Sequence, residues 1–139
     1  MKLFKIMISM ILMTGLMACN SVSETVNVLR STTVAQEYSG SIMNVDKIEL
    51  VDGSTGYRKS IQDKAEIQTF ISNIKDLVLI PDKNQEGRTG YIYRIIFYEQ
   101  EEVKLDFIPN AVNNTYYEPN ADLLKIINKE FEERFGREF

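Results

Sequence analysis

Residues 90–108 read GYIYRIIFYEQEEVKLDFI and carry the strongest strand pattern in the chain. Residues 90–98 are rich in β-branched and aromatic side chains and are largely apolar on both alternating faces, which is typical of a central strand covered on two sides. Residues 103–108 alternate between apolar and polar side chains, which predicts a strand with one solvated face. Because the acidic residues 99–102 separate the two segments, the stretch predicts an antiparallel hairpin.

Charge and hydropathy together predict how the two strands of this hairpin pair. Apolar residues meet apolar residues, and opposite charges face each other, when Ile95 lies opposite Leu105. The pairs in this register are Ile95 with Leu105, Arg94 with Asp106 and Phe97 with Val103. The expected three-residue loop, Glu-Gln-Glu, lacks the glycine that is common in so short a turn.

The residues before this hairpin predict a second hairpin and a helix. Apolar residues within 42–50 lead to the turn sequence DGSTG at 52–56, and residues 57–61 follow as the returning strand. Asp63 has the spacing of an N-cap with a glutamate three residues later, and apolar residues then recur at helical intervals up to Leu77. This part of the chain is therefore expected to fold as strand, strand and helix.

The residues after the central hairpin predict a last strand and a last helix. Thr115–Tyr117 is a short segment between turn signals, and Asn120 is expected to cap a helix whose apolar residues recur up to Phe135. Gly136 suits the position just after the end of that helix. The order β-β-α-β-β-β-α predicts a single α+β domain over residues 41–139, with two helices packed on one face of a mostly antiparallel sheet of four to five strands.

Composition bounds the size and the chemistry of this domain. The chain has 139 residues, 44% of them hydrophobic and 26% charged, which fits one globular domain. It has no histidine and a single cysteine, which excludes Ser-His-Asp and Cys-His catalysis, an internal disulfide and a thiolate-rich zinc site. No set of carboxylates stands at a spacing that fixes a catalytic geometry, so we expect no enzyme, no cofactor and no metal site. The net charge of −4 also argues against a nucleic-acid partner.

The first 18 residues have the pattern of a secretory signal peptide. Lys2 and Lys5 precede the apolar run IMISMILMTGLM at residues 6–17, and the small residue Ala18 follows it. A membrane-spanning helix needs ~20 apolar residues, which this run does not supply. Residues 1–18 are therefore predicted to be a cleaved signal.

Leu16-Met17-Ala18-Cys19 resembles the lipobox of bacterial lipoproteins. In that family the cysteine thiol receives a diacylglycerol, and the signal is then cut so that the cysteine becomes the first residue. The resemblance implies cleavage between Ala18 and Cys19, acyl chains such as palmitate on Cys19, and attachment to the extracytoplasmic face of the cell membrane. We expect residues 19–40 to form the lipidated residue and a flexible tether. An uncleaved N-terminal anchor and an ordinary signal peptide with a chance cysteine are the alternatives.

Two stretches of the domain extend this resemblance. Residues 48–71, IELVDGSTGYRKSIQDKAEIQTFI, and residues 90–107, GYIYRIIFYEQEEVKLDF, resemble small uncharacterised lipoproteins of low-GC Gram-positive bacteria. The likeness lies in fold patterns rather than in chemical motifs. It therefore supports an architecture and a location and implies no activity.

One face of the predicted sheet is the candidate binding surface. The helices are expected to cover the face that carries Phe97, Val103 and Leu105, so apolar residues on the other face need cover from a loop, the N-terminal segment or a partner. The candidate partner-binding residues are Ile92, Arg94, Ile96, Tyr98 and Ile108. The sequence thus predicts a membrane-tethered extracytoplasmic lipoprotein with a non-catalytic domain that binds a protein or envelope component. An inhibitor or immunity-type lipoprotein and a carboxylate-based hydrolase are the alternatives.

Three other segments have partial likeness to known sites. Residues 82–87 match the first half of an EF-hand loop in part, but Tyr93 stands where that loop needs a bidentate glutamate. The three glutamates within residues 99–102 are expected to keep the hairpin tip soluble. Residues 52–56 lack the lysine and the helix of a phosphate-binding loop. We therefore interpret residues 82–87 as a solvated loop and the other two segments as turns.

Overall fold

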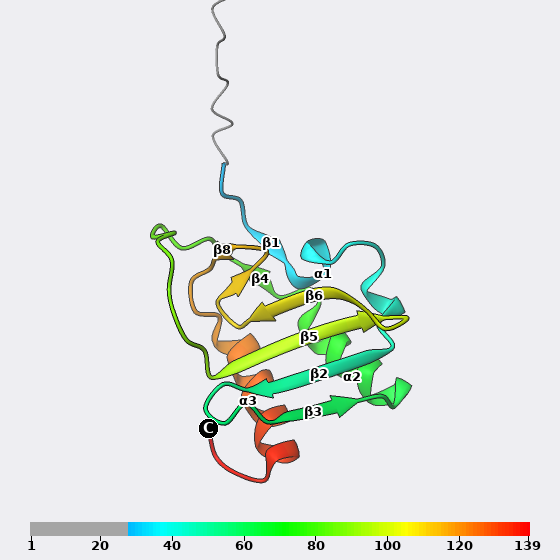
Figure 1. Cartoon of the computed structure of the whole chain (residues 1–139). Coiled ribbons are helices and arrows are strands. Elements are labelled where there is room, and N and C mark those ends of the chain that lie inside the picture. The colour runs from blue at the N-terminus through cyan, green and yellow to red at the C-terminus, as the bar shows by residue number, and fades with distance from the viewer. Residues whose placement is uncertain (1–27) are drawn as a thin grey trace, which may run out of the picture.

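The computed structural model describes residues 28–139. The predicted signal peptide, Cys19 and residues 20–27 lie outside the described residues. Within 28–139 the chain forms an antiparallel sheet with two helices, α2 (Lys64–Ile74) and α3 (Ala121–Phe135), on one of its faces (Figure 1). The strands of the sheet, in spatial order, are β3 (Arg58–Ile61), β2 (Lys47–Asp52), β5 (Tyr93–Glu99), β6 (Glu102–Ile108), β7 (Ala111–Val112) and β8 (Thr115–Tyr116). The predicted α+β class is confirmed.

The sheet has six strands instead of the four to five predicted. The difference comes from β7, which is only two residues long and pairs with both β6 and β8. Asn113 and Asn114 make the turn that follows it, and both have positive φ angles. A strand this short has no alternating pattern that the sequence could reveal.

The helix ends lie where the capping pattern predicts them. The side chain of Asp63 accepts a hydrogen bond from the backbone N–H of Glu66 at 2.9 Å, and Asn120 accepts one from Leu123 at the same distance. Gly136 ends α3 in the left-handed region with φ 68°. The apolar sides of both helices enter a single core together with the inner residues of β2, β5 and β6. The predicted helices are confirmed.

The register predicted for the central hairpin is wrong by two residues. Ile95 lies opposite Phe107 and Phe97 opposite Leu105, and an irregularity between Phe97 and Tyr98 then sets Tyr98 opposite Val103. The chain reverses in two residues, Gln100 and Glu101, both with positive φ, where a three-residue loop was expected. This tighter turn and the β-bulge after Phe97 together account for the shift.

Some consequences of the predicted register survive the shift and one does not. A shift of two residues keeps each side chain on its face, so Leu105 and Phe107 remain in the core. The predicted ion pair between Arg94 and Asp106 forms as a diagonal contact, with Nε–Oδ1 and Nη2–Oδ2 distances of 2.8 and 2.5 Å. Val103, which was expected in the core, is exposed because the bulge turns it to the other side.

The folded domain begins before residue 41, so the predicted extent of the tether is also wrong. β1 (Thr32–Thr33) pairs with β4 (Val78–Leu79), and α1 (Val34–Glu37) follows directly. Val34 and Tyr38 are buried in the core. These residues are held by partners far along the chain, and their segment has no periodicity of its own. Residues 42–44 likewise form a short 3₁₀ helix, η1 (Ile42–Asn44), and not the start of a strand.

Candidate functional site

The sheet face without helices carries three of the five predicted partner-binding residues. We call it the open face. Alternation along β5 places Arg94, Ile96 and Tyr98 there, beside Glu49 and Val51 of β2. Ile96 is only 4% exposed although no helix lies over it. Something other than a second layer therefore covers the apolar residues of this face.

The cover is a network of long charged side chains. Glu49 accepts hydrogen bonds from Arg58 at 2.7 Å and from the Tyr98 hydroxyl at 3.1 Å. The Lys47 ammonium lies 3.8 Å from the centre of the Tyr98 ring, a cation–π contact. Partial burial and the hydrogen bond to Glu49 raise the pKa of Tyr98. The stems of these side chains cover apolar surface while their charged ends remain in water.

This network changes the meaning of the predicted binding face. Arg94 and Tyr98 already have partners within the chain, and Ile96, which lies between them along β5, is buried. The open face presents a charged surface instead of the apolar one that the sequence suggested. Its centre therefore offers little apolar area to a partner.

The other two predicted residues, Ile92 and Ile108, line an apolar hollow that also includes Leu124 of α3. Ile92 is 54% exposed, and Tyr91 and Leu124 are exposed beside it. The hollow has a volume of about 270 Å³, which suits one or two side chains. We call it the β5 groove; it is lined by Gly90, Tyr91, Ile92, Tyr93, Ile108, Pro109, Asn110, Pro119, Asn120 and Leu124.

Backbone contacts fix the walls of the β5 groove. Gly53 donates a hydrogen bond to the carbonyl oxygen of Ile92 at 2.8 Å, and a Cβ at this glycine would lie 1.9 Å from the carbonyl oxygen of Tyr91. Asn120 caps α3 with its amide oxygen and donates its amide N–H to the carbonyl oxygen of Val78 at 2.9 Å. The groove is thus formed in the folded chain and does not require a loop to move. Gly53, in the turn that residues 52–56 were predicted to form, allows this close approach of the two backbone segments.

A buried ion pair supports the inner side of the same turn. The Asp52 carboxylate is 1% exposed and accepts hydrogen bonds from Arg137 at 2.6 Å, from the Thr55 hydroxyl at 2.7 Å and from the Ser54 N–H at 2.8 Å. Burial alone would raise the pKa of Asp52, but these hydrogen bonds outweigh it and lower the pKa from 3.8 to about 2.

Sequence reasoning did not find the partner of Asp52. The signal was present: Asp52 continues the buried alternation of Ile48 and Leu50, and a buried carboxylate needs a cation. Arg137 lies 85 residues away in the chain, however, and nothing in its own neighbourhood marks it. The Phe139 ring, 3.8 Å from the Arg137 guanidinium, also packs against Tyr93 and so joins the C-terminal residues to the core.

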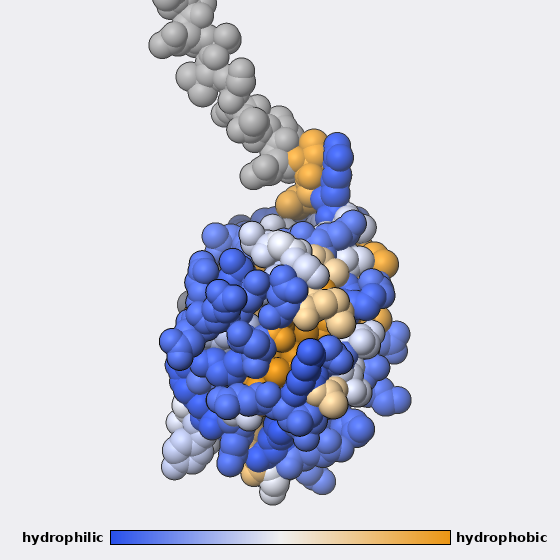
Figure 2. Space-filling view, turned by 90° about the vertical axis from the view of Figure 1, so that its right-hand side faces the viewer, coloured by the Kyte–Doolittle hydropathy of each residue, from blue (hydrophilic) through white to orange (hydrophobic). Residues whose placement is uncertain are grey.

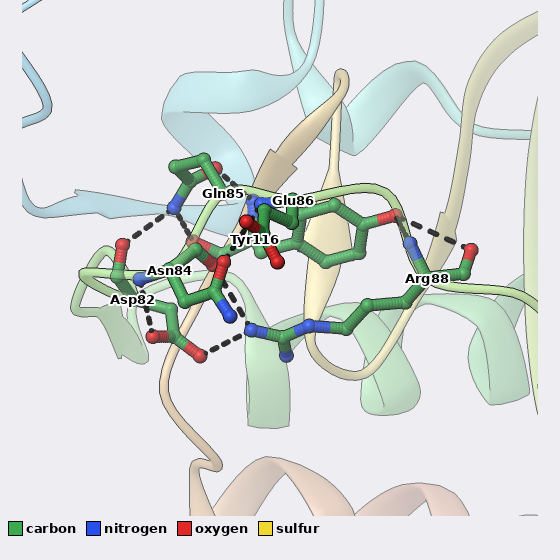
Figure 3. A network of polar contacts seen from close by, with 6 residues as sticks. All are labelled: Asp82, Asn84, Gln85, Glu86, Arg88 and Tyr116. Carbon is green, nitrogen blue, oxygen red and sulfur yellow. Dashed lines mark hydrogen bonds and ion pairs between the residues drawn. The ribbon is translucent and has the colours of Figure 1, made fainter.

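Residues 82–88 form a closed loop tied by its own side chains (Figure 3). Arg88 binds the Asp82 carboxylate at 2.6 Å and the Asn84 carbonyl oxygen at 3.0 Å, and the hydrogen bond from Arg88 lowers the pKa of Asp82. Gln85 and Tyr116 exchange hydrogen bonds of 2.8 and 2.9 Å. The Asp82 carboxylate, which would be the first ligand of an EF-hand loop, is therefore already bound by an arginine of the same loop. The loop was expected to be solvated, but its side chains form hydrogen bonds within the loop and to Tyr116.

The acidic hairpin tip borders a second hollow, of about 610 Å³, beside η1 and α2. Figure 2 views this side and shows a small apolar floor among hydrophilic residues. Its acidic groups are engaged, since Glu99 accepts from the Tyr38 hydroxyl at 3.0 Å and Asp46 accepts from the Gln100 N–H at 2.7 Å. In the part of the chain that the structure describes, no three acidic or cysteine side chains gather as metal ligands.

Comparisons with known proteins give no relative for this chain. No family model, curated protein or solved structure matches it. Among residues 28–139, no helix has both the length and the apolar character needed to cross a bilayer.

Proposed function

We propose that this chain is a lipid-anchored extracytoplasmic protein whose domain binds an apolar side chain of a protein partner and carries out no catalysis. The anchor is supported by the lipobox pattern that ends at Cys19, after a basic and then apolar leader. Two or three acyl chains hold a protein firmly at a membrane, whereas one holds it only marginally.

The β5 groove is the observation that carries the binding function. It joins two predicted residues, Ile92 and Ile108, to the exposed Tyr91 and Leu124, and its walls are fixed before any ligand arrives. A preformed apolar hollow with aromatic lining and few polar groups suits an apolar anchor residue of a partner. An inhibitor or immunity-type lipoprotein would use the same groove.

The ion pairs of the domain support binding over catalysis. The carboxylates of Asp52, Asp82 and Asp106 each accept hydrogen bonds from an arginine of the same chain. Hydrogen bonds from Arg137 and Arg88 lower the pKa of Asp52 and of Asp82, and a carboxylate with a lowered pKa is a poor general acid or base near neutral pH. The carboxylate-based hydrolase is therefore not proposed.

Site-specific photo-crosslinking in native cells tests the groove. A photoreactive residue replaces Leu124 in the groove, and in a matched variant it replaces Val103, which is exposed on β6 outside the groove. We expect a discrete cross-linked product from position 124 that is absent at position 103 and is abolished by Ile92→Asp. Equal products from both positions, or none from position 124, would refute the groove as the binding site.

Replacement of Cys19 tests the anchor. In Cys19→Ala we expect an unprocessed chain or release from membranes, because no thiol remains to accept the diacylglycerol. Membrane fractionation and the intact mass of the mature protein give the result. Normal cleavage with unchanged membrane retention would contradict lipidation.

A further inference from the structure

A small second layer lies at the end of the domain where the described chain begins. β1 and β4 pair there with Thr33 opposite Val78 and Thr32 opposite Leu79, and Figure 1 shows the two strands side by side. Glu118 extends this layer beyond β4, because it donates its backbone N–H to the carbonyl oxygen of Ile80 at 2.8 Å. The layer has one face toward the core and one toward solvent.

The solvent face of this layer is apolar. Leu79 is fully buried in the core, and alternation turns its neighbours Val78 and Ile80 outward, where they are 55% and 51% exposed. Val28 and Leu29, the first described residues, are exposed at the same end, and Figure 2 shows hydrophobic side chains where the described chain begins. We call Val28, Leu29, Val78 and Ile80 the root patch.

We propose that the root patch lies on the surface of the membrane that holds Cys19. This inference rests on the proposed lipid anchor. Cys19 precedes Val28 by nine residues, so even a fully extended chain keeps Val28, the first residue of the patch, within about 32 Å of the acylated residue. A tether this short gives the patch a high effective concentration at the bilayer, so weak apolar contacts suffice to hold it there.

The charges around the root patch permit this contact. Arg30 follows Leu29 directly, and Asp82, near the end of the layer, is neutralised by Arg88 at 2.6 Å. Glu118 lies beside Ile80 in the same layer. Arg30 and the pairing of Arg88 with Asp82 thus offset acidic charge near the patch, which anionic lipid would otherwise repel.

Fluorescence in bilayers can test the inference on the full lipidated protein. Acylation consumes Cys19, so Val78→Cys introduces a single free thiol for a fluorescent label. Val103→Cys is the matched control, because the Val103 side chain is 50% exposed and β6, which carries it, belongs to a different sheet from β4. The labelled proteins are reconstituted into phosphatidylethanolamine–phosphatidylglycerol vesicles with and without spin-labelled lipids.

We expect lipid-borne spin labels to quench the label at position 78 about twofold or more, and the label at position 103 hardly at all, because an interfacial apolar face sits about 5–10 Å deep in the bilayer. Equal quenching at both positions, or none at position 78, would overturn the inference. A patch that is covered by protein instead of lipid would give the second result. A chain that takes up two labels and stays out of the vesicles would instead show that Cys19 is free. That result would refute the proposed anchor itself, and so the two failures are distinguishable.

Discussion

The two faces of the β5 strand bury the same kind of residue in different ways. Ile95 points to the helix-covered face and is fully buried, while its neighbour Ile96 points to the open face and is 4% exposed. Helices α2 and α3 cover the first, and the second is covered by the charged side chains of the sheet itself. Burial on an open sheet face therefore needs no second layer and no partner when long ionic side chains pair across the strands.

We expect the largest change in stability from replacing Ile95, and replacing Ile96 in the same way compares the two faces directly. Ile95→Ala leaves a cavity among rigid core side chains and should lower the free energy of unfolding by about 4 kcal/mol. Ile96→Ala should lower it by about 2 kcal/mol, because flexible side chains and water can fill the space. Urea denaturation of both variants measures the difference. Equal losses would mean that the open face is packed as rigidly as the core.

A smaller effect is expected for the charge on the covered face. Asp52→Asn loses charged hydrogen bonds to Arg137 and should lower the free energy of unfolding by about 2 kcal/mol at neutral pH. The pKa of Asp52 is lower in the folded chain, at about 2 against 3.8, so its stabilisation is complete above about pH 4 and is lost as the pH falls toward 2.

Acid titration of stability isolates this group. The wild type should lose more of its free energy of unfolding between about pH 5 and pH 2.5 than Asp52→Asn does. Arg137→Gln removes the strongest hydrogen-bond donor to Asp52 and should also reduce the dependence. Identical pH profiles of the wild type and Asp52→Asn would show that the pair contributes nothing to acid stability.

We expect the smallest change in stability when the charge of Arg94 on the open face is removed but the apolar part of its side chain is kept. Arg94→Met abolishes the ion pair with Asp106 and retains most of the apolar cover, so we expect a change within about 0.5 kcal/mol. Arg94→Ala removes the stem as well and should cost more. If Arg94→Met destabilised the domain as much as Arg94→Ala, the charge and not the stem would be what covers Ile96.

The parts of the fold that follow from neighbouring residues could be predicted. Asp63 and Asn120 were identified as caps because a cap depends on residues two or three positions away. The faces of the central hairpin were predicted because alternation is a local pattern. Its register was not, because the φ angles of Gln100 and Glu101 and the bulge after Phe97 leave no mark on composition.

The candidate site was predicted only in part. Ile92 and Ile108 were named as candidate residues and both line the groove, but Leu124 and Pro119, which complete it, come from the α3 end of the chain. Arg94 and Tyr98 were proposed to face a partner, and the structure gives both of them partners within the chain. Alternation shows which side of a strand a residue occupies, and it does not show what comes to lie over that side.

The α+β class and the two long helices with their caps could be inferred from the sequence without the structure, because alternation and capping are patterns of nearby residues. The resemblance of residues 16–19 to a lipobox also comes from the sequence, and the proposed anchor rests on it. The pairing of Asp52 with Arg137, the burial of Val34 and Tyr38 in the core, and the apolar groove beside Ile92 became visible only in the folded chain. Such contacts join residues far apart in the chain, and their free energy arises only when packing brings both partners out of water together.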